Sequence, residues 1–457
     1  MIAPFRRPSS LTALAVLAML AVPARAAAAE QPVAIFHAFD QRYADVAGFV
    51  CTLGAQGYSH VQLAPAQKSN PLREWYGRYQ PVDYSIIEGM GSEAELRELV
   101  RTAHGCGVKV IADVVFNHMA NLEEFSDLRF PQLGAANFHP QCAIDYADGN
   151  RDTELNCWLG ASPTSRGLPD LDVSRAAVQE VQKAHLRKLL DLGVDGFRFD
   201  AAKHLPADVL RRYLTFVDGR RRDGWNYLEV IEDTDTKAEH YSGVAAVTDF
   251  VLYRALKRAF TFGGDLRSLR VAEAVPDARS TTFGRNHDNI REIQANPIDP
   301  YDDRTDSWLA TAFVLAREGG TPLVLNWDNA DAAFIPAGVT FRRIMCRRGA
   351  AGGSVKENVL GVIDSPTVLV MERGAEGFFV VNKATQGFDQ AALDLTLTHL
   401  EGCYREVRTG LLAAVERRPD GKKWVTRWGT WGRGGLQIGA RDALYFVRES
   451  WSTCQLR

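Results

Sequence analysis

Three acidic residues each follow a short stretch typical of a buried β-strand. Asp200 ends "GFRFD", Glu229 ends "NYLE" and Asp288 ends "TTFGRNHD". Two carboxyl groups in one cleft are the chemistry of glycoside hydrolysis, because a protonated one donates to the leaving oxygen while an ionised one attacks the anomeric carbon. One such acid alone is more often part of a structural ion pair or a solvated loop. Three that converge on one site indicate catalysis.

An arginine stands two residues before the first of these acids. Side chains two residues apart project to the same side of a strand, so Arg198 and Asp200 are expected to lie together. A buried unpaired charge is costly, and a positive neighbour lowers the pKa of a carboxyl group. We therefore expect Asp200 to be an ionised nucleophile whose counter-charge is Arg198.

Eight strand-like segments separated by helical patterns must position these residues. The segments are "VAIFHAF" (33–39), "SHVQLAP" (59–65), "VKVIADVVFNH" (108–118), "GVDGFRFD" (193–200), "NYLEVI" (226–231), "AVTDFVL" (246–252), "ARSTTFGRNHD" (278–288) and "TPLVLN" (321–326). Repeated β-then-α units with a count of eight predict an α/β fold of the (β/α)8 TIM-barrel type, whose active site lies at the carboxyl ends of the strands. No glycine-rich phosphate loop follows the first segment, which argues against a dinucleotide-binding fold.

The predicted barrel occupies 30–118 and 174–349 and is interrupted after its third strand. Residues 119–173 are rich in Asn, Asp, Pro and Gly and show no clear helix, so we interpret them as an inserted subdomain. From 350 to 457 the pattern predicts a separate antiparallel β-sandwich domain. Its expected strands are "TVLVME" (367–372), "GFFVVN" (377–382), "ALDLTLTHL" (392–400) and "DALYFV" (442–447).

Residues 1–29 have the features of a secretory signal peptide. A basic start is followed by the apolar run 11–22 and by small residues, with cleavage expected after Ala26 or within 27–29. Twelve apolar residues are too few to span a bilayer. We therefore expect a secreted or periplasmic protein with no membrane attachment after cleavage. Seven cysteines then make disulfides plausible and leave at least one unpaired, and the lack of CxxC spacing argues against structural zinc.

The charge of the chain bears on its partners. The formal net charge is only -3, so there is no basic field to attract nucleic acid, and a neutral partner is expected.

Four segments resemble the signature segments of the α-amylase family, glycoside hydrolase family 13, and occur in the family's order. They are "DVVFNH" (113–118), "GFRFDAAKH" (196–204), "EVI" (229–231) and "NHD" (286–288). The flanking segments "HAFDQRYADVAG" (37–48), "EWYGRYQPVDY" (74–84), "GLPDLD" (167–172) and "FVLAREGGTPLVL" (313–325) extend the likeness over about 33–330. The likeness is to the animal and actinobacterial type of α-amylase.

The resemblance implies roles for individual residues. Asp200 would be the nucleophile, Glu229 the general acid/base (with Glu232 as a rival) and Asp288 a carboxylate that grips sugar hydroxyls. Residues implied to bind substrate are Trp75, Tyr76, Tyr79, Gln80, His118, Arg198, Lys203, His204 and His287. The first four resemble the family's aromatic platform, on which sugar rings stack, and Lys203 and His204 would line the subsite past the cleaved bond.

The resemblance also implies a calcium ion that ties the inserted subdomain to the barrel. Its ligands would be the Asn117 and Asp170 side chains (with Asp172 as a rival) and the backbone carbonyls of His204 and Leu155. Hard oxygen ligands suit this ion.

The cysteines and two departures from the family's pattern complete these expectations. Cys142–Cys157 resembles a disulfide of relatives, while Cys51–Cys106 and Cys403–Cys454 are left open. Relatives that bind chloride carry a basic residue where this chain has Leu323, so we expect that chloride is not required. Gln41 replaces a tryptophan usual after "HAFD".

The expected activity is that of a secreted α-amylase, a retaining endo-hydrolase of α-1,4-glucans with no partner chain, acting as a monomer. A maltooligosaccharide-forming amylase or a 4-α-glucanotransferase would use the same residues with different loops. A non-catalytic glucan-binding homologue would be expected to lack one of the three carboxylates, and all three are present.

Overall fold

The structure is a computed structural model that describes residues 31–121, 130–147, 151–221, 223–294, 296–360, 363–390, 393–427 and 435–455. The expected signal peptide, residues 1–29, lies outside the described residues. In the part of the chain that is described, no helix is both long and apolar enough to cross a membrane.

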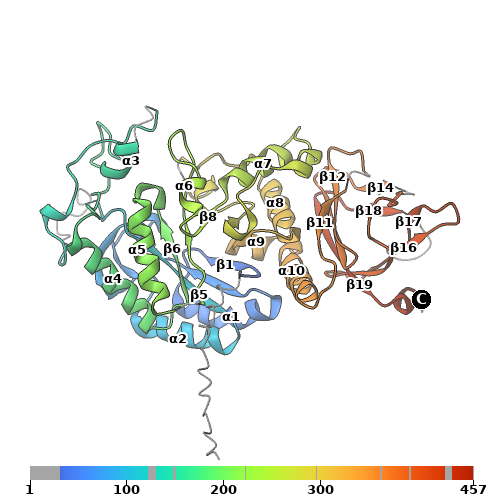
Figure 1. The fold of residues 1–457 in the computed structure, drawn as a ribbon, viewed down its shortest axis with the longest axis horizontal. Helices are drawn as coiled ribbons and strands as arrows, with labels where there is room; N and C mark the ends of the chain where they lie inside the picture. Colours follow the sequence, from blue (N-terminus) through green and yellow to red (C-terminus); the bar gives the residue numbers. More distant parts are fainter. Residues whose placement is uncertain are drawn as a thin grey trace, which may run out of the picture.

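Eight parallel strands close into a barrel, seen in the left half of Figure 1. They are β1 (Ile35–Ala38), β2 (His60–Leu63), β5 (Lys109–Val115), β6 (Gly196–Asp200), β7 (Tyr227–Leu228), β8 (Ala246–Thr248), β9 (Ser280–Thr282) and β10 (Thr321–Leu325). Their order around the barrel follows the chain, and β10 closes it against β1. Each strand falls within one of the eight expected segments, so the (β/α)8 prediction is confirmed.

Amphipathic helices cover the outside of the barrel. They are α1 (Tyr43–Gln56), α2 (Glu93–Gly105), α4 (Ala176–Asp191), α5 (Ala207–Asp218), α7 (Phe250–Phe260), α8 (Arg304–Ala316) and α10 (Phe334–Ala350). The α2 helix begins with a capping box, in which Ser92 and Glu95 satisfy each other's backbone N–H groups. The α1 helix ends at Gly57, whose φ of 120° is open to glycine but strained for other residues.

Two expected strands differ from the structure. Only Ala246–Thr248 of segment 246–252 is extended, because the Asp249 side chain accepts a hydrogen bond from the Leu252 N–H and starts α7. Within 393–400, the described part of segment 392–400, there is one isolated bridge, between Asp394 and Trp424, and turns follow it. The Asp394 side chain accepts from the Thr396 N–H, which closes a local turn in place of a ladder.

A hairpin and an inserted segment extend from the loops that follow β2 and β5. The hairpin consists of β3 (Gln67–Ser69) and β4 (Pro81–Ile87), joined through the 3-10 helix η1 (Trp75–Tyr79). In the described part of the inserted segment, between β5 and α4, lie η2 (Ala135–Asn137) and α3 (Arg151–Asn156), with α3 at the upper left of Figure 1. Neither the hairpin nor α3 was predicted from the sequence.

The C-terminal domain is a seven-stranded sheet with a small two-stranded one. The large sheet runs β11 (Glu357–Val359), β12 (Val368–Arg373), β13 (Gly377–Asn382), β19 (Asp442–Glu449), β15 (Gly402–Glu406), β16 (Leu412–Arg417) and β17 (Lys423–Arg427), all antiparallel. The small one pairs β14 (Phe388–Gln390) with β18 (Leu436–Ile438). The expected antiparallel C-terminal domain is thus confirmed.

Alternation along β13 explains how this domain attaches to the barrel. Phe379 and Val381 belong to the same core as the barrel, whereas Phe378 and Val380 face the domain's own core. Side chains of a strand alternate between its two faces, so one face of the sheet packs on α8 and α10 while the other builds a second core. The barrel and the sheet therefore share one continuous core.

Six of the seven cysteines are paired. The disulfides are Cys51–Cys106, Cys142–Cys157 and Cys403–Cys454, and Cys346 is free and exposed. The Cys142–Cys157 disulfide expected from the resemblance is confirmed. The pairings Cys51–Cys106 and Cys403–Cys454, which the sequence left open, also form.

Candidate active site

The guanidinium of Arg198 is the centre of the site at the carboxyl ends of the strands. Its Nη1 lies 2.5 Å from Asp113 Oδ2 and 2.8 Å from Asp200 Oδ1, and its Nη2 donates to Glu229 Oε1. Asp113 stands opposite Arg198 in the register of β5 and β6, and Glu229 directly follows β7. Arg198 is only 3% exposed, so three neighbouring strands deliver carboxylates to one buried cation.

The backbone after β6 fixes the second oxygen of Glu229. Ala201 has φ 46° and ψ 34°, a left-handed conformation that is unusual for alanine. Its N–H donates to Glu229 Oε2 at 2.9 Å, while the Glu229 N–H continues the ladder by donating to the Phe199 carbonyl. The rival Glu232 is engaged elsewhere, because its two oxygens accept from the Ala238 N–H and from Arg254.

Burial dominates the protonation of these carboxyl groups. It raises the pKa of Asp200 and of Asp288 well above the usual range and that of Asp113 to about 7, although Arg198 acts to lower all three. For Glu229 burial also raises the pKa, but Arg198, His287 and the Ala201 N–H together bring it below its ordinary value. The expectation that Arg198 keeps the pKa of Asp200 low is therefore wrong for the net shift: burial and the neighbouring carboxylates outweigh one guanidinium.

Asp288 lies in a turn that leaves one oxygen available. The Asn286 side chain accepts from the Asp288 N–H at 3.1 Å, and Asp288 hydrogen-bonds with Glu229. Its Oδ2 is buried and has no hydrogen-bond partner. Such an oxygen is suited to accept a hydrogen bond from a hydroxyl group of a ligand.

Rings from two loops pack around His287. It stacks on Phe39 at 5.0 Å and on Tyr79 at 5.5 Å between ring centroids, and Trp75 meets it edge-on at 5.4 Å. The Tyr79 hydroxyl donates to Asp113, which anchors η1 to the carboxylate cluster. Tyr76 is 43% exposed and presents its ring to solvent.

Two residues expected to touch substrate, His118 and Gln80, also hold neighbouring loops together. His118 is buried, and its Nε2 lies 2.9 Å from the Tyr79 carbonyl oxygen. The Gln80 side-chain oxygen accepts from the Asn70 amide and the Asn121 N–H. Both positions orient the loops that carry the aromatic residues.

Lys203 and His204 connect the barrel to the inserted segment. Lys203 Nζ lies 2.5 Å from Asp233 Oδ2 and 3.7 Å from Glu154 Oε1, and the Tyr146 ring covers it with a centroid distance of 4.7 Å. His204 Nδ1 donates to the Glu154 carbonyl at 2.9 Å.

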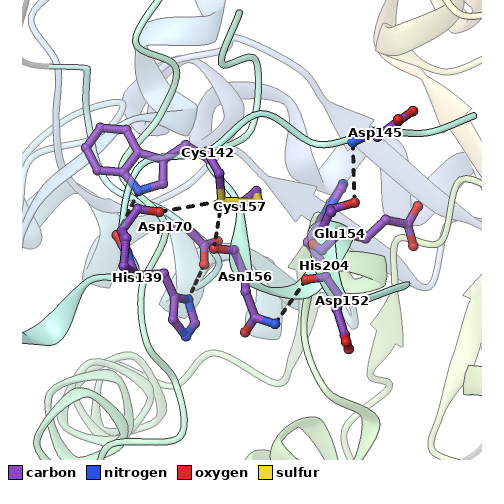
Figure 2. Close-up of a disulfide and its surroundings, with 12 residues drawn as sticks. His139, Cys142, Asp145, Asp152, Glu154, Asn156, Cys157, Asp170 and His204 are labelled. Carbon is purple, nitrogen blue, oxygen red and sulfur yellow. Dashed lines mark hydrogen bonds and ion pairs between the residues drawn. A yellow bond between two sulfur atoms is a disulfide. The ribbon is translucent and has the colours of Figure 1, made fainter. Parts of the chain in front are cut away.

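Two of the residues expected to bind calcium, Asp170 and His204, lie on either side of the Cys142–Cys157 disulfide in Figure 2. Asp170 is 1% exposed, and its Oδ2 accepts from His139 Nδ1 at 2.6 Å, whereas its Oδ1 is buried without a partner. The Asn117 side chain hydrogen-bonds to Asp170, yet burial still raises the pKa of Asp170 to about 7. Leu155 lies in α3, which packs on the η3 turn (Ala202–His204).

This donor set fits a hard cation. A buried carboxylate oxygen without a partner needs a positive charge, and amide and backbone oxygens complete the kind of shell that Ca²⁺ prefers. Within the described residues there is no group of three or more His, Cys, Asp or Glu side chains that could hold a metal. The expected calcium ligands are not such a group, because they include one carboxylate, one amide and two backbone carbonyls. The rival Asp172 binds Ser174 and Arg175 instead.

The contacts that four residues make with the site were not predicted from the sequence. Asp113, His139, Tyr146 and Asp233 hold Arg198, Asp170 and Lys203 in place. The position of Asp113 at a strand end was a usable signal. The other three lie in loops whose pairing depends on the tertiary fold.

Comparisons with known proteins agree with this geometry. Residues 56–264 match the family described as "Alpha amylase, catalytic domain". An α-amylase of Thermomonospora curvata is 29% identical over 444 residues, which is 87% of this chain and 71% of that protein. An α-amylase of Aeromonas hydrophila is 33% identical over 312 residues, 64% of this chain and 67% of that protein.

A solved structure shares the fold. The α-amylase I of Eisenia fetida, as a mutant in complex with maltohexaose, superposes with a TM-score of 0.72 at 20% identity, over 92% of this chain and 99% of that one.

A closed parallel barrel with clustered carboxyl groups at its carboxyl end, and relatives with this activity, define the protein as a glycoside hydrolase. The chain belongs to the α-amylase family.

Proposed function

We propose that the protein hydrolyses internal α-1,4-glucosidic bonds of starch- or glycogen-type glucans with retention of configuration. The observation that carries this proposal is the sharing of the Arg198 guanidinium by Asp200 and Glu229. Two carboxyl groups on one guanidinium are close enough for the about 5–5.5 Å separation of retaining enzymes, rather than the wider gap that admits a water in inverting ones. The relatives named α-amylase support the bond specificity.

In the proposed mechanism Asp200 attacks the anomeric carbon as a carboxylate while Glu229 protonates the leaving glycosidic oxygen. The covalent glycosyl-enzyme is then hydrolysed by a water whose proton returns to Glu229, and Asp200 leaves as a carboxylate. Protons within the cluster are shared, since four buried carboxyl groups around one arginine cannot all be ionised. The pKa shifts favour this proton on Asp200 or Asp288 rather than on Glu229, so in the proposed mechanism it moves to Glu229 when substrate binds and Asp200 ionises.

The surrounding residues are proposed to bind the sugar. Asp288 Oδ2 would accept a hydrogen bond from a hydroxyl group of the sugar ring whose bond is cleaved, and His287 would lie beside Asp288. Trp75 and Tyr76 would stack on the apolar faces of neighbouring rings, and Tyr79 would orient them. Lys203 and His204 would line the subsite past the cleaved bond.

We propose that Asp170, Asn117 and the carbonyls of Leu155 and His204 hold Ca²⁺. The partnerless Oδ1 of Asp170 supports this assignment. The ion would supply the positive charge that fixes the inserted segment against the barrel, so that Lys203 and His204 keep their positions.

We also propose that the protein is exported through the signal peptide at 1–29 and acts as a monomer on a neutral glucan. Three disulfides support export, because such bonds persist in oxidising compartments.

The test is a time course of products from maltoheptaose and soluble starch, resolved by length and anomer. Internal cleavage with early α-anomeric products, absent in Asp200→Asn, is expected. Longer chains without new reducing ends would reassign the protein as a glucanotransferase. No turnover of any α-glucan by the folded, calcium-loaded protein would refute the proposal.

A further inference from the structure

A cleft of about 520 Å³ lies on the C-terminal domain, away from the barrel mouth. It is formed near the ends of β15, β16 and β19 and by α11 (Trp451–Gln455), at the right-hand end of Figure 1. Its volume falls within the about 300–1,000 Å³ that is usual for small-molecule sites. None of its residues takes part in the site described above.

An anchored tryptophan forms one wall of this cleft. Trp451 is 39% exposed and is the first residue of α11. The Cys403–Cys454 disulfide ties this short helix to β15, and both sulfurs are buried against Ala414 and Leu412. The helix that carries Trp451 is therefore held against β15, and part of the tryptophan stays exposed to a ligand.

Charged groups of both signs form the other walls. They are Glu401, Glu416, Glu449, Arg417 and Arg448. The Arg417 guanidinium lies 3.2 Å from Glu401, so these two exposed groups form a donor and acceptor pair. Three carboxylates and two guanidinium groups leave no net positive charge, which disfavours an anionic ligand.

The guanidinium of Arg448 is available to a ligand. It lies along the strand over Gly402, where a Cβ would be 3.6 Å from its Nε, and Gly402 has a φ of 140°. In the described part of the chain this guanidinium makes no ion pair with another side chain. Glycine at 402 leaves room for it to lie flat beside the cleft.

We propose that this cleft is a second α-glucan site, which holds a polymeric substrate away from the barrel mouth. A neutral sugar ring offers an apolar face to an indole, and its hydroxyls both donate to carboxylates and accept from guanidinium groups. The mixed charges around Trp451 match that combination better than they match a phosphate or a lipid. The inference rests on the proposed glucan activity, because the same polymer would occupy both sites.

Adsorption to starch granules tests the second site directly. Trp451→Ala and Arg448→Met are each placed in the Asp200→Asn chain so that the granules are not digested during the measurement. Trp451→Ala is expected to weaken adsorption about tenfold, the loss typical of a central aromatic contact, and Arg448→Met to weaken it less. The matched control is Leu397→Ala, an 84% exposed apolar residue of the same domain outside the cleft, which should change adsorption by less than about twofold.

Two further measurements separate the outcomes. Trp451→Ala with Asp200 intact should hydrolyse maltoheptaose with a kcat/KM within about twofold of the wild type, but need more soluble starch for half its maximal rate. One free thiol per chain, from Cys346, shows that α11 is still tied down. Equal adsorption of the Trp451→Ala and parent chains, or no adsorption of the parent, overturns the second site. Failure of the wild type to cleave maltoheptaose overturns the proposed function instead.

Discussion

Two buried arginines lie near the carboxyl ends of the barrel strands and differ in how many carboxylates they meet. Arg285 follows β9 and pairs with Asp328 alone, at 2.7 Å, and both side chains are at most 4% exposed. Trp308 and Thr311 donate the remaining hydrogen bonds to Asp328. Arg198 meets Asp113, Asp200 and Glu229, with Asp288 bonded to Glu229 beside them.

The ratio of charges separates a structural pair from a reactive cluster. One arginine and one carboxylate compensate each other's charge: burial raises the pKa of Asp328, while Arg285, Thr311 and Trp308 act to lower it. Four carboxyl groups around Arg198 exceed what one cation can neutralise, and burial then keeps protons within the cluster. Both sites contain a buried arginine, but only the Arg198 site has more carboxyl groups than its one positive charge can neutralise.

Asp200→Asn should give the largest effect. We expect kcat on maltoheptaose to fall by about 10³-fold or more, because an amide cannot act as the nucleophile. The melting temperature should not fall, since the change removes one negative charge from an overloaded cluster and keeps an oxygen for Arg198. Kinetics and thermal unfolding of the same preparation test both parts. A lower melting temperature would mean that Asp200 is needed for stability.

Asp328→Asn should show the reverse behaviour. Its removal leaves the Arg285 charge buried without compensation, so the free energy of unfolding should fall by about 3–5 kcal/mol. Activity per folded molecule should stay within about tenfold of the wild type, because no reacting group is changed. Urea unfolding and kcat below the melting range provide the measurement. Unchanged stability would contradict the distinction between the two arginines.

Apolar runs bounded by glycine and polar residues were enough to predict the eight barrel strands. They failed where a side chain competed with the ladder, as Asp249 does at the start of α7 and Asp394 does in its turn. The short hairpin β3–β4 was also missed, because its pairing shifts register and leaves little alternation to detect.

Strand ends predicted where the carboxylates meet, but not their protonation. The contact of Asp113 with Arg198 spans 85 positions and arises from the register of two parallel strands. The net rise in the pKa of Asp200 depends on burial by the whole barrel, which neighbouring residue types do not reveal. His139 binds Asp170 for the same reason, since the inserted segment has no periodic pattern to place it.

Asp170 is a buried carboxylate that is not paired with an arginine in the way that Asp200 and Asp328 are. We expect Ca²⁺ to supply the positive charge that compensates it. The wild type should gain about 2–3 kcal/mol of stability when Ca²⁺ is added after chelation, at about 100 times its Kd. Asp170→Asn should lose this calcium-dependent gain, and Asp172→Asn, whose carboxylate binds Ser174 and Arg175, should keep it. Unfolding with and without a chelator reads this out. An equal gain in both variants would exclude Asp170 as a ligand.

The pH dependence of the stability of Asp113→Asn tests whether the Arg198 cluster holds more negative charge than it can compensate. The pKa of Asp113 rises from 3.8 to about 7, so the native state keeps a proton that the unfolded chain releases. The corresponding stability is fully present below about pH 4 and is lost as the pH rises towards about 7. The neutral amide avoids this loss, so the variant should gain about 2–3 kcal/mol relative to the wild type between pH 5 and pH 8. Urea unfolding at both pH values measures it, and an equal difference at the two would show that Asp113 is already ionised at pH 5.

Replacing chloride should have the smallest effect. Carboxylates already occupy both terminal nitrogens of Arg198, so a chloride ion would have to displace one of them and join a cluster with surplus negative charge. Leu323, buried on β10, offers no second cation to compensate it. We expect kcat on maltoheptaose to change by less than about twofold when chloride is replaced by acetate at equal ionic strength. A larger fall, restored by chloride, would show that an anion binds beside Arg198 in the working enzyme despite the carboxylates already around it.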